Sequence, residues 1–154
     1  MSKKNKPKSF GLDPQFKKDT KERYGHPVDL SDMPDEMKMS AKLIALAEPF
    51  HEGELDQPTL YDCATIAWNE CVQEDHNKRT DYVLNNALLN FTNYRDMIDI
   101  LKARKRRLFP DDVRGIKEVA VIYKRNGDYS VNVVSDMNLE FMAKVMAEKL
   151  KKYK

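Results

Sequence analysis

Glycine is scarce in this sequence, and its five occurrences are scattered along the chain. A phosphate-binding loop and a dinucleotide-binding fingerprint each need closely spaced glycines, so neither site is expected. No Gly-x-Ser-x-Gly segment is present either, which removes the nucleophile elbow of many hydrolases. The sequence therefore contains no motif for a cofactor or a catalytic nucleophile. A small enzyme whose site cannot be read from the sequence remains an alternative.

Long apolar runs are also missing. A membrane-spanning helix needs ~20 consecutive apolar residues, and no stretch approaches that length. The first residues are basic, with Lys3 and Lys4 among them, but no apolar block follows, so we expect no secretory signal. These features predict a cytoplasmic protein that does not bind membranes.

The sequence has only two cysteines, Cys63 and Cys71, which are eight residues apart in a segment with helical periodicity. A rise of ~1.5 Å per residue separates them by about 12 Å, whereas a disulfide needs Cα atoms within ~7 Å. We expect two buried, reduced and slowly reacting thiols. A reactive thiol is the alternative, although no basic residue lies close by to lower its pKa.

A metal site is not expected either. Residues 51–56 superficially resemble the helix motif of zinc proteases, but Leu55 stands where the second histidine is needed and Gly53 interrupts the helix. We interpret the segment as a solvated acidic turn. His76 and His26 are interpreted as residues of a helix end and a turn.

Charge is distributed unevenly, although the net charge is only +2. Residues 26–76 hold two lysines and twelve acidic residues, whereas residues 77–154 hold seventeen basic and ten acidic ones. One interpretation is that the acidic half packs against the basic half within the fold. The other is a basic face that meets an acidic protein or nucleic acid.

The hydrophobic periodicity predicts about three helices in the first two thirds of the chain. The first begins near Ser31-Asp32 and ends near Pro49, and the third runs from about Thr80 to Leu108. The second, capped by Asp56, has the clearest pattern. Its apolar side is made by Leu60, Cys63, Ala64, Ala67, Trp68 and Cys71.

The period then changes to that of strands. Residues 116–123 and 129–134 are rich in β-branched and aromatic residues, and Asn126-Gly127 between them predicts a type I′ hairpin turn. A final amphipathic helix is expected over residues 139–153. The predicted pairs across the hairpin are Arg125 with Asp128, Ile122 with Val131, and Ala120 with Val133.

The fold class is therefore α+β, with N-terminal helices followed by a β-hairpin and a C-terminal helix. Residues 1–32 contain several prolines and lysines without a clean period, and we expect a basic arm that is mostly extended or disordered. Residues 33–154 form a single domain in this interpretation.

One dense basic run invites a functional hypothesis. Lys102, Arg104, Lys105, Arg106 and Arg107 could bind phosphates of nucleic acid or another polyanion. At ~100° per residue, however, these side chains are distributed around the helix rather than on one face. That arrangement favours a solvated helix end, where cations complement the macrodipole.

Trp68 and Asn69 form a second candidate, as residues of a binding pocket. Trp68 lies on the apolar side of its helix, which favours a core anchor. Asn69 lies off that side, where its amide could form hydrogen bonds with a neighbouring strand or loop. A binding role for the pair would need an open pocket beside the indole.

The Ala67-Trp68-Asn69 segment closing a helix, with residues 106–112 (RRLFPDD) leading into a hairpin, resembles a group of uncharacterised prokaryotic proteins. The similarity covers roughly residues 38–135. It implies the helix–hairpin arrangement and no particular activity. The expectation is a non-catalytic binding or interaction module without a cofactor. Its candidate partners are an acidic protein, nucleic acid or a second copy of the chain.

Overall fold

The computed structural model describes residues 14–24, 38–78, 94–125 and 127–136, and five residues beyond them (143, 146, 147, 150 and 151). These residues combine helices with a two-stranded antiparallel hairpin, so the α+β prediction is confirmed for them. The elements, in chain order, are α1 (Pro14–Tyr24), α2 (Met39–Ala47), the 3₁₀ helix η2 (Glu48–Phe50), α3 (Gln57–His76), α4 (Arg95–Leu108), β1 (Ile116–Tyr123) and β2 (Tyr129–Ser135).

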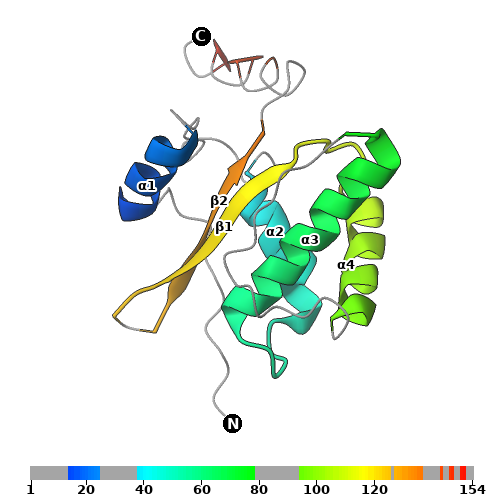
Figure 1. Ribbon diagram of the computed structural model, residues 1–154, viewed down its shortest axis with the longest axis horizontal. Coiled ribbons are helices and arrows are strands. Elements are labelled where there is room, and N and C mark those ends of the chain that lie inside the picture. Colours follow the sequence, from blue (N-terminus) through cyan, green and yellow to red (C-terminus); the bar gives the residue numbers. More distant parts are fainter. Residues whose placement is uncertain are drawn as a thin grey trace.

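Helix α3 forms where the periodicity predicts it. The Asp56 carboxylate accepts a hydrogen bond from the backbone N–H of Thr59 at 3.4 Å, and Pro58 lies in the first turn. Asn77 ends the helix with a φ of 51°, a left-handed conformation that asparagine tolerates well. This long, well-capped helix lies between α4 on one side and the hairpin on the other (Figure 1).

The other two predicted helices are confirmed over part of their length. Helix α2 buries Leu43 and Leu46, and Pro49 brings it into the short η2 turn. The start signal predicted near Ser31 lies outside the described residues. Helix α4 covers the last half of the predicted third helix, and residues 79–93 also lie outside the description.

The hairpin is where it was predicted, but its predicted register is wrong by one residue. Val121 pairs with Val131 and Ile122 with Ser130. The N–H of Lys124 donates to the Asp128 carbonyl and the N–H of Gly127 donates to the Lys124 carbonyl. The loop thus has three residues rather than two, and Gly127 takes a φ of 86° as its last residue. A one-residue change of register moves every β1 side chain to the other face.

The apolar face that meets the helices therefore carries Val119 and Val121 rather than Ala120 and Ile122. A bulge between Ile116 and Glu118 inserts one extra residue near the start of β1. The extra residue shifts the alternation of side chains between the two faces by one position. As a result, Ile116 lies on the same face as Val119 and Val121 and is 1% exposed in the core.

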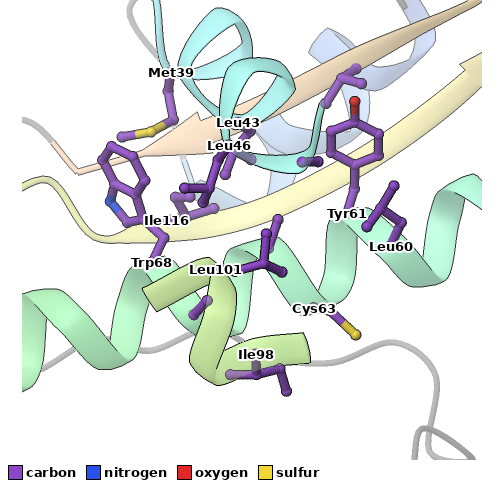
Figure 2. Close-up of a cluster of buried hydrophobic side chains, with 14 of the residues drawn as sticks. Met39, Leu43, Leu46, Leu60, Tyr61, Cys63, Trp68, Ile98, Leu101 and Ile116 are labelled. Carbon is purple, nitrogen blue, oxygen red and sulfur yellow. The ribbon is translucent and has the colours of Figure 1, made fainter. Parts of the chain in front are cut away.

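The core joins α2, α4 and the hairpin around α3, and Figure 2 shows many of its side chains. Trp68, the largest of them, is completely buried, as its position on the apolar side predicted. Its ring packs against Phe109, with ring centroids 5.8 Å apart. The labelled core residues are Met39, Leu43, Leu46, Leu60, Tyr61, Cys63, Trp68, Ile98, Leu101 and Ile116.

The N-terminal region differs from the extended arm that the sequence suggested, because residues 14–24 form helix α1. Pro14 suits the first helical position, and the Gln15 amide donates to Asp19 one turn later, at 2.9 Å. Phe16 is buried, which anchors the helix. In Figure 1, α1 lies on the other side of the hairpin from α3. The rest of the predicted arm, residues 1–13 and 25–32, lies outside the described residues.

The predicted C-terminal helix stays a prediction, because residues 139–153 lie mostly outside the description. Ala143, Met146 and Leu150 from its expected apolar side are exposed, Met146 by 58% and Leu150 by 61%. These three side chains do not join the core. None of the helices among the described residues is long and apolar enough to cross a membrane.

Replacing Trp68 with alanine should lower the free energy of unfolding by ~3–5 kcal/mol, because the substitution leaves a cavity at the centre of the core. Urea denaturation measures the loss. Ile100→Ala on the exposed side of α4 is the control and should cost less than about 1 kcal/mol. A loss for Trp68→Ala as small as that of the control would contradict the burial of the indole.

Candidate functional site

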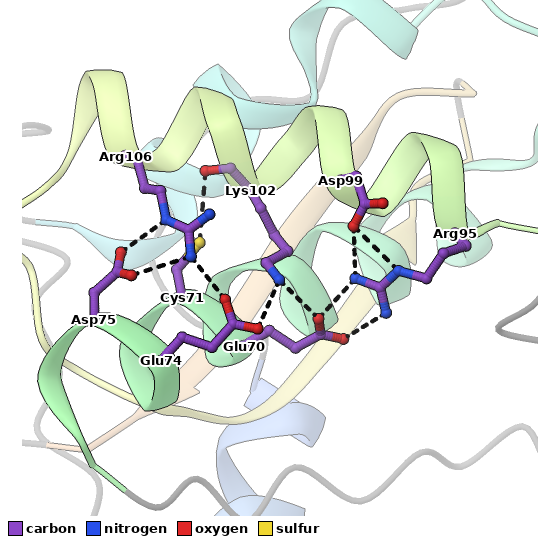
Figure 3. A network of polar contacts seen from close by, with 8 residues as sticks. All are labelled: Glu70, Cys71, Glu74, Asp75, Arg95, Asp99, Lys102 and Arg106. Carbon is purple, nitrogen blue, oxygen red and sulfur yellow. Dashed lines mark hydrogen bonds and ion pairs between the residues drawn. The ribbon is translucent and has the colours of Figure 1, made fainter.

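The basic residues of α4 face a row of carboxylates on α3 (Figure 3). The Arg95 guanidinium donates to both carboxylate oxygens of Glu70, at 2.7 and 3.0 Å. The Lys102 ammonium bridges Glu70 and Glu74, at 3.2 and 2.8 Å. Arg106 donates to Glu74 at 2.7 Å and to both carboxylate oxygens of Asp75 at 2.9 and 3.0 Å. We call this network the α3–α4 ionic seam.

The seam keeps its carboxylates ionised. The hydrogen bond from Arg95 lowers the pKa of Glu70, the hydrogen bond from Lys102 lowers the pKa of Glu74, and Arg106 does the same for Asp75. These contacts confirm, for this pair of helices, the prediction that the acidic and basic halves of the chain pack against each other.

Two further members of the basic run bind backbone carbonyls rather than carboxylates. Arg104 donates to the carbonyls of Ala45 and Leu46, both at 2.9 Å, in the last turn of α2. These carbonyls lack helical partners because the helix ends there, and a guanidinium is a favourable partner for them. Arg104 thereby fixes the end of α2 against α4.

Lys105 is almost completely buried, with 1% exposure. Its ammonium donates to the carbonyls of Phe109 and Asp112, both at 3.0 Å, and lies 4.6 Å from the centre of the Trp68 ring. Burial lowers the pKa of this lysine, while the two carbonyls and the aromatic face solvate its charge. The residue closes the loop after α4 and does not reach the surface.

Arg106 and Arg107 are both exposed, but Arg107 forms no ion pair or hydrogen bond within the described part of the chain. The structure thus uses four of the five predicted polyanion-binding residues in contacts within the fold. They do not come together as one free basic face.

Trp68 and Asn69 are both used to join α3 to the start of the hairpin. The indole N–H of Trp68 donates to the Arg114 carbonyl at 2.7 Å. The Asn69 amide donates to the Ile116 carbonyl at 3.0 Å and its oxygen accepts from the Ile116 N–H at 2.8 Å. Asn69 therefore acts as a short strand partner, which confirms its predicted hydrogen bonding. The same contacts occupy the polar atoms that a ligand of this pair would need.

A buried charge cluster lies next to this junction. Asp112, 7% exposed at its side chain, accepts hydrogen bonds from Lys42 at 2.6 Å and from the Arg114 guanidinium at 2.6 and 3.0 Å. Burial alone would raise the pKa of Asp112, but Arg114 and Lys42 outweigh it and hold the pKa well below its ordinary value. The cluster ties α2 to the loop between α4 and β1.

The acidic turn around His51 contains a contact that the sequence did not predict. The Tyr129 hydroxyl donates to the Gln57 amide oxygen at 2.9 Å, and the Gln57 amide donates to the His51 carbonyl at 3.2 Å. The Tyr129 oxygen also lies 3.1 Å from Nδ1 of His51. Because the hydroxyl has one proton and gives it to Gln57, Nδ1 must be the donor to Tyr129. Only the three-dimensional approach of the turn to β2 creates this cluster.

The described residues contain neither a cluster of metal ligands nor an exposed thiol. Within the described residues, no group of three or more His, Cys, Asp or Glu side chains could hold a metal ion. Cys63 and Cys71 are buried and unbridged, and burial raises the pKa of the Cys63 thiol to about 12 and also raises that of Cys71. Both thiols are therefore protonated and poorly nucleophilic, in agreement with the sequence prediction.

The tip of the hairpin presents a small surface of different composition, which we call the hairpin tip and define as Tyr123, Lys124 and Arg125. Tyr123 is 56% exposed and Arg125 is also exposed. The Tyr123 ring packs beside that of Tyr129, with centroids 5.6 Å apart. In Figure 1, the tip extends away from α3 and α4. The sequence pattern predicts only a strand and a turn for these residues.

Comparisons with protein-family models, curated proteins and solved structures gave no match for this chain. The resemblance to uncharacterised prokaryotic proteins therefore stays a prediction.

The Asp112 cluster predicts a specific loss of stability in acid. A carboxyl whose pKa is lowered by folding stabilises the native state above its unfolded pKa of ~3.9, and that stabilisation is lost as the pH falls towards the folded pKa. Asp112→Asn should cost ~3–5 kcal/mol at neutral pH, because it leaves buried cations without their carboxylate. It should also flatten the decline of stability between about pH 5 and pH 2.

Urea denaturation at a series of pH values measures both effects. Asp111→Asn, at the exposed neighbouring carboxylate, is the matched control and should keep the wild-type pH dependence. Parallel pH profiles for wild type and Asp112→Asn would show that Asp112 does not supply this stability.

Proposed function

We propose that this protein is a non-catalytic interaction module of the cytoplasm, and that its hairpin tip binds an acidic surface of a protein partner. The observation that carries the proposal is the exposure of Tyr123 beside Arg125 at the end of the hairpin. Tyrosine and arginine are among the residues most enriched at the energetic centres of protein interfaces. An aromatic ring next to basic residues in the chain suits a partner surface that combines apolar contacts with carboxylates.

The anchoring of the hairpin supports this role. Tyr129, at the base of the tip, is held by Gln57 and His51 and packs against the Tyr123 ring. The contact surface is therefore ordered before a partner arrives, which reduces the entropy lost on binding.

The buried cysteines and tyrosines favour binding over catalysis. The two thiols and the hydroxyls of Tyr61 and Tyr129 have raised pKa values, so they are protonated at neutral pH. A catalytic nucleophile or base needs a pKa shifted in the opposite direction, towards the working pH. The carboxylates with lowered pKa values are held in ion pairs inside the fold.

Nucleic-acid binding through Lys102, Arg104, Lys105, Arg106 and Arg107 is the second candidate function. Arg107 favours it, since that side chain is exposed, but the other four already contact acceptors of the protein. Binding through Arg107 alone should be weak and should vanish near physiological salt.

In the test, the full chain is immobilised on a resin and incubated with an extract of the cells that produce it. Three forms are compared: wild type, the tip variant Tyr123→Ala/Arg125→Glu, and the control Lys21→Glu, which makes the same change of charge on exposed α1. The wild type and the control should retain specific acidic proteins from the extract. We expect the tip variant to bind these proteins at least roughly tenfold more weakly, because it removes two central contacts. Each retained protein is then purified and titrated directly against the three forms.

Equal retention by the tip variant and the wild type would contradict the proposal. A nuclease-treated sample separates the alternative, because retention that disappears after nuclease treatment indicates nucleic acid. Titration of labelled duplex DNA at several salt concentrations gives the same distinction with a defined probe.

A further inference from the structure

The exposed side of α4 has a regular spacing that the hairpin tip does not involve. Asp96, Ile100, Ala103 and Arg107 are separated by four, three and four residues, which is the spacing of a coiled-coil seam. At ~100° per residue they lie within one narrow stripe, opposite the buried Leu101. All four are exposed, and Ile100 has half of its surface in solvent. We call this stripe the outer seam.

The outer seam is polar at its ends and apolar at its centre. Asp96 lies in the first turn of α4 and Arg107 in the last, and neither forms an ion pair within the described residues. Ile100 and Ala103 lie between them. The charges of the stripe are therefore complementary to those of a second stripe that runs in the opposite direction.

We propose that the outer seam is a self-association surface, on which α4 packs antiparallel against α4 of a second copy. The two copies are related by a two-fold axis near the middle of the helix, so each contact occurs twice. Asp96 then faces Arg107 of the second copy, and Ile100 packs on Ala103 of the second copy. The small Ala103 side chain allows the two backbones to approach closely.

The charges select this orientation among the possible occupants. A parallel pair of helices would place Arg107 opposite Arg107 and Asp96 opposite Asp96, which is repulsive at both ends. A polyanion would contact Arg107 but would be repelled by Asp96. A second antiparallel copy satisfies both ends and covers Ile100 as well.

The size of the seam determines the strength of association to expect. Helix α4 has 14 residues, which is about 21 Å of helix. A contact between two helices of this length lies at the small end of specific interfaces. The dimer is therefore weak and in equilibrium with the monomer at micromolar concentrations. It does not depend on the hairpin tip.

Sedimentation velocity of the full chain, from low micromolar to near-millimolar protein, tests the proposal. The wild type should shift from monomer to dimer as the concentration rises. Asp96→Arg and Arg107→Asp should each weaken the dimer by roughly tenfold, because each variant places two like-charge contacts in every dimer. Ile100→Ser should weaken it as well.

Mixing the two charge variants provides the sharpest test. In an antiparallel heterodimer of Asp96→Arg with Arg107→Asp, the two substituted positions face each other with opposite charges. The unchanged Asp96 and Arg107 also face each other. The equimolar mixture should therefore regain association close to that of the wild type, while each variant alone still associates roughly tenfold more weakly. Lys21→Asp on the exposed side of α1 is the control with the same change of charge as Arg107→Asp, and it should dimerise normally.

Circular dichroism establishes that each variant is folded, which is expected because all the changed side chains are exposed. A wild type that stays monomeric over the whole range would overturn the proposal. Dimerisation that the charge variants do not weaken, or a mixture that does not regain association, would overturn it too.

Discussion

The whole fold depends on the hydrogen bonds by which α3 holds the start of the hairpin. Trp68 and Asn69 are consecutive residues on α3, and together they bind the backbone at Arg114 and Ile116. Hydrogen bonds buried away from water are costly to leave unmade, so this junction permits little choice in where β1 begins. A bulge immediately after Ile116 then turns the strand so that its apolar side meets the helices.

The position of α4 follows from the same frame. Once α3 lies at the centre, its acidic side meets the basic side of α4, and the α3–α4 ionic seam forms along the contact. The chain thus uses most of its basic run to neutralise its own carboxylates and to hold free helix ends. The two exposed surfaces, the outer seam of α4 and the hairpin tip, lie on different elements. The two surfaces could therefore bind partners independently.

Local patterns in the sequence predict much of the fold. The Asp56 cap, the spacing of apolar residues in α3 and the glycine of the hairpin loop each act over a few residues, and the helix and hairpin that they predict are present. The predicted register of the hairpin is wrong, because Asn126-Gly127 suits loops of two or three residues. Only packing against the helices determines which face of β1 is buried. The helical position of Phe16 was missed because no clear period surrounds it.

The functional predictions depended on contacts between distant residues, which is where sequence patterns are weakest. The angles around α4 correctly argued against a single basic face. They did not reveal that Arg104 would reach α2, or that Lys105 would lie over Trp68. Likewise, His51 and Tyr129 are far apart in the chain, and nothing in either local segment predicts their hydrogen bond.

The amide exchange rate of Ile116 in the native state tests the central junction most directly. With Asn69 as its acceptor, this N–H should exchange only as slowly as global unfolding allows. In Asn69→Ala it should exchange much faster, while the amide of Asn132, which pairs with Ala120 in the hairpin, remains protected. Fast exchange of the Ile116 amide in the wild type would contradict the account.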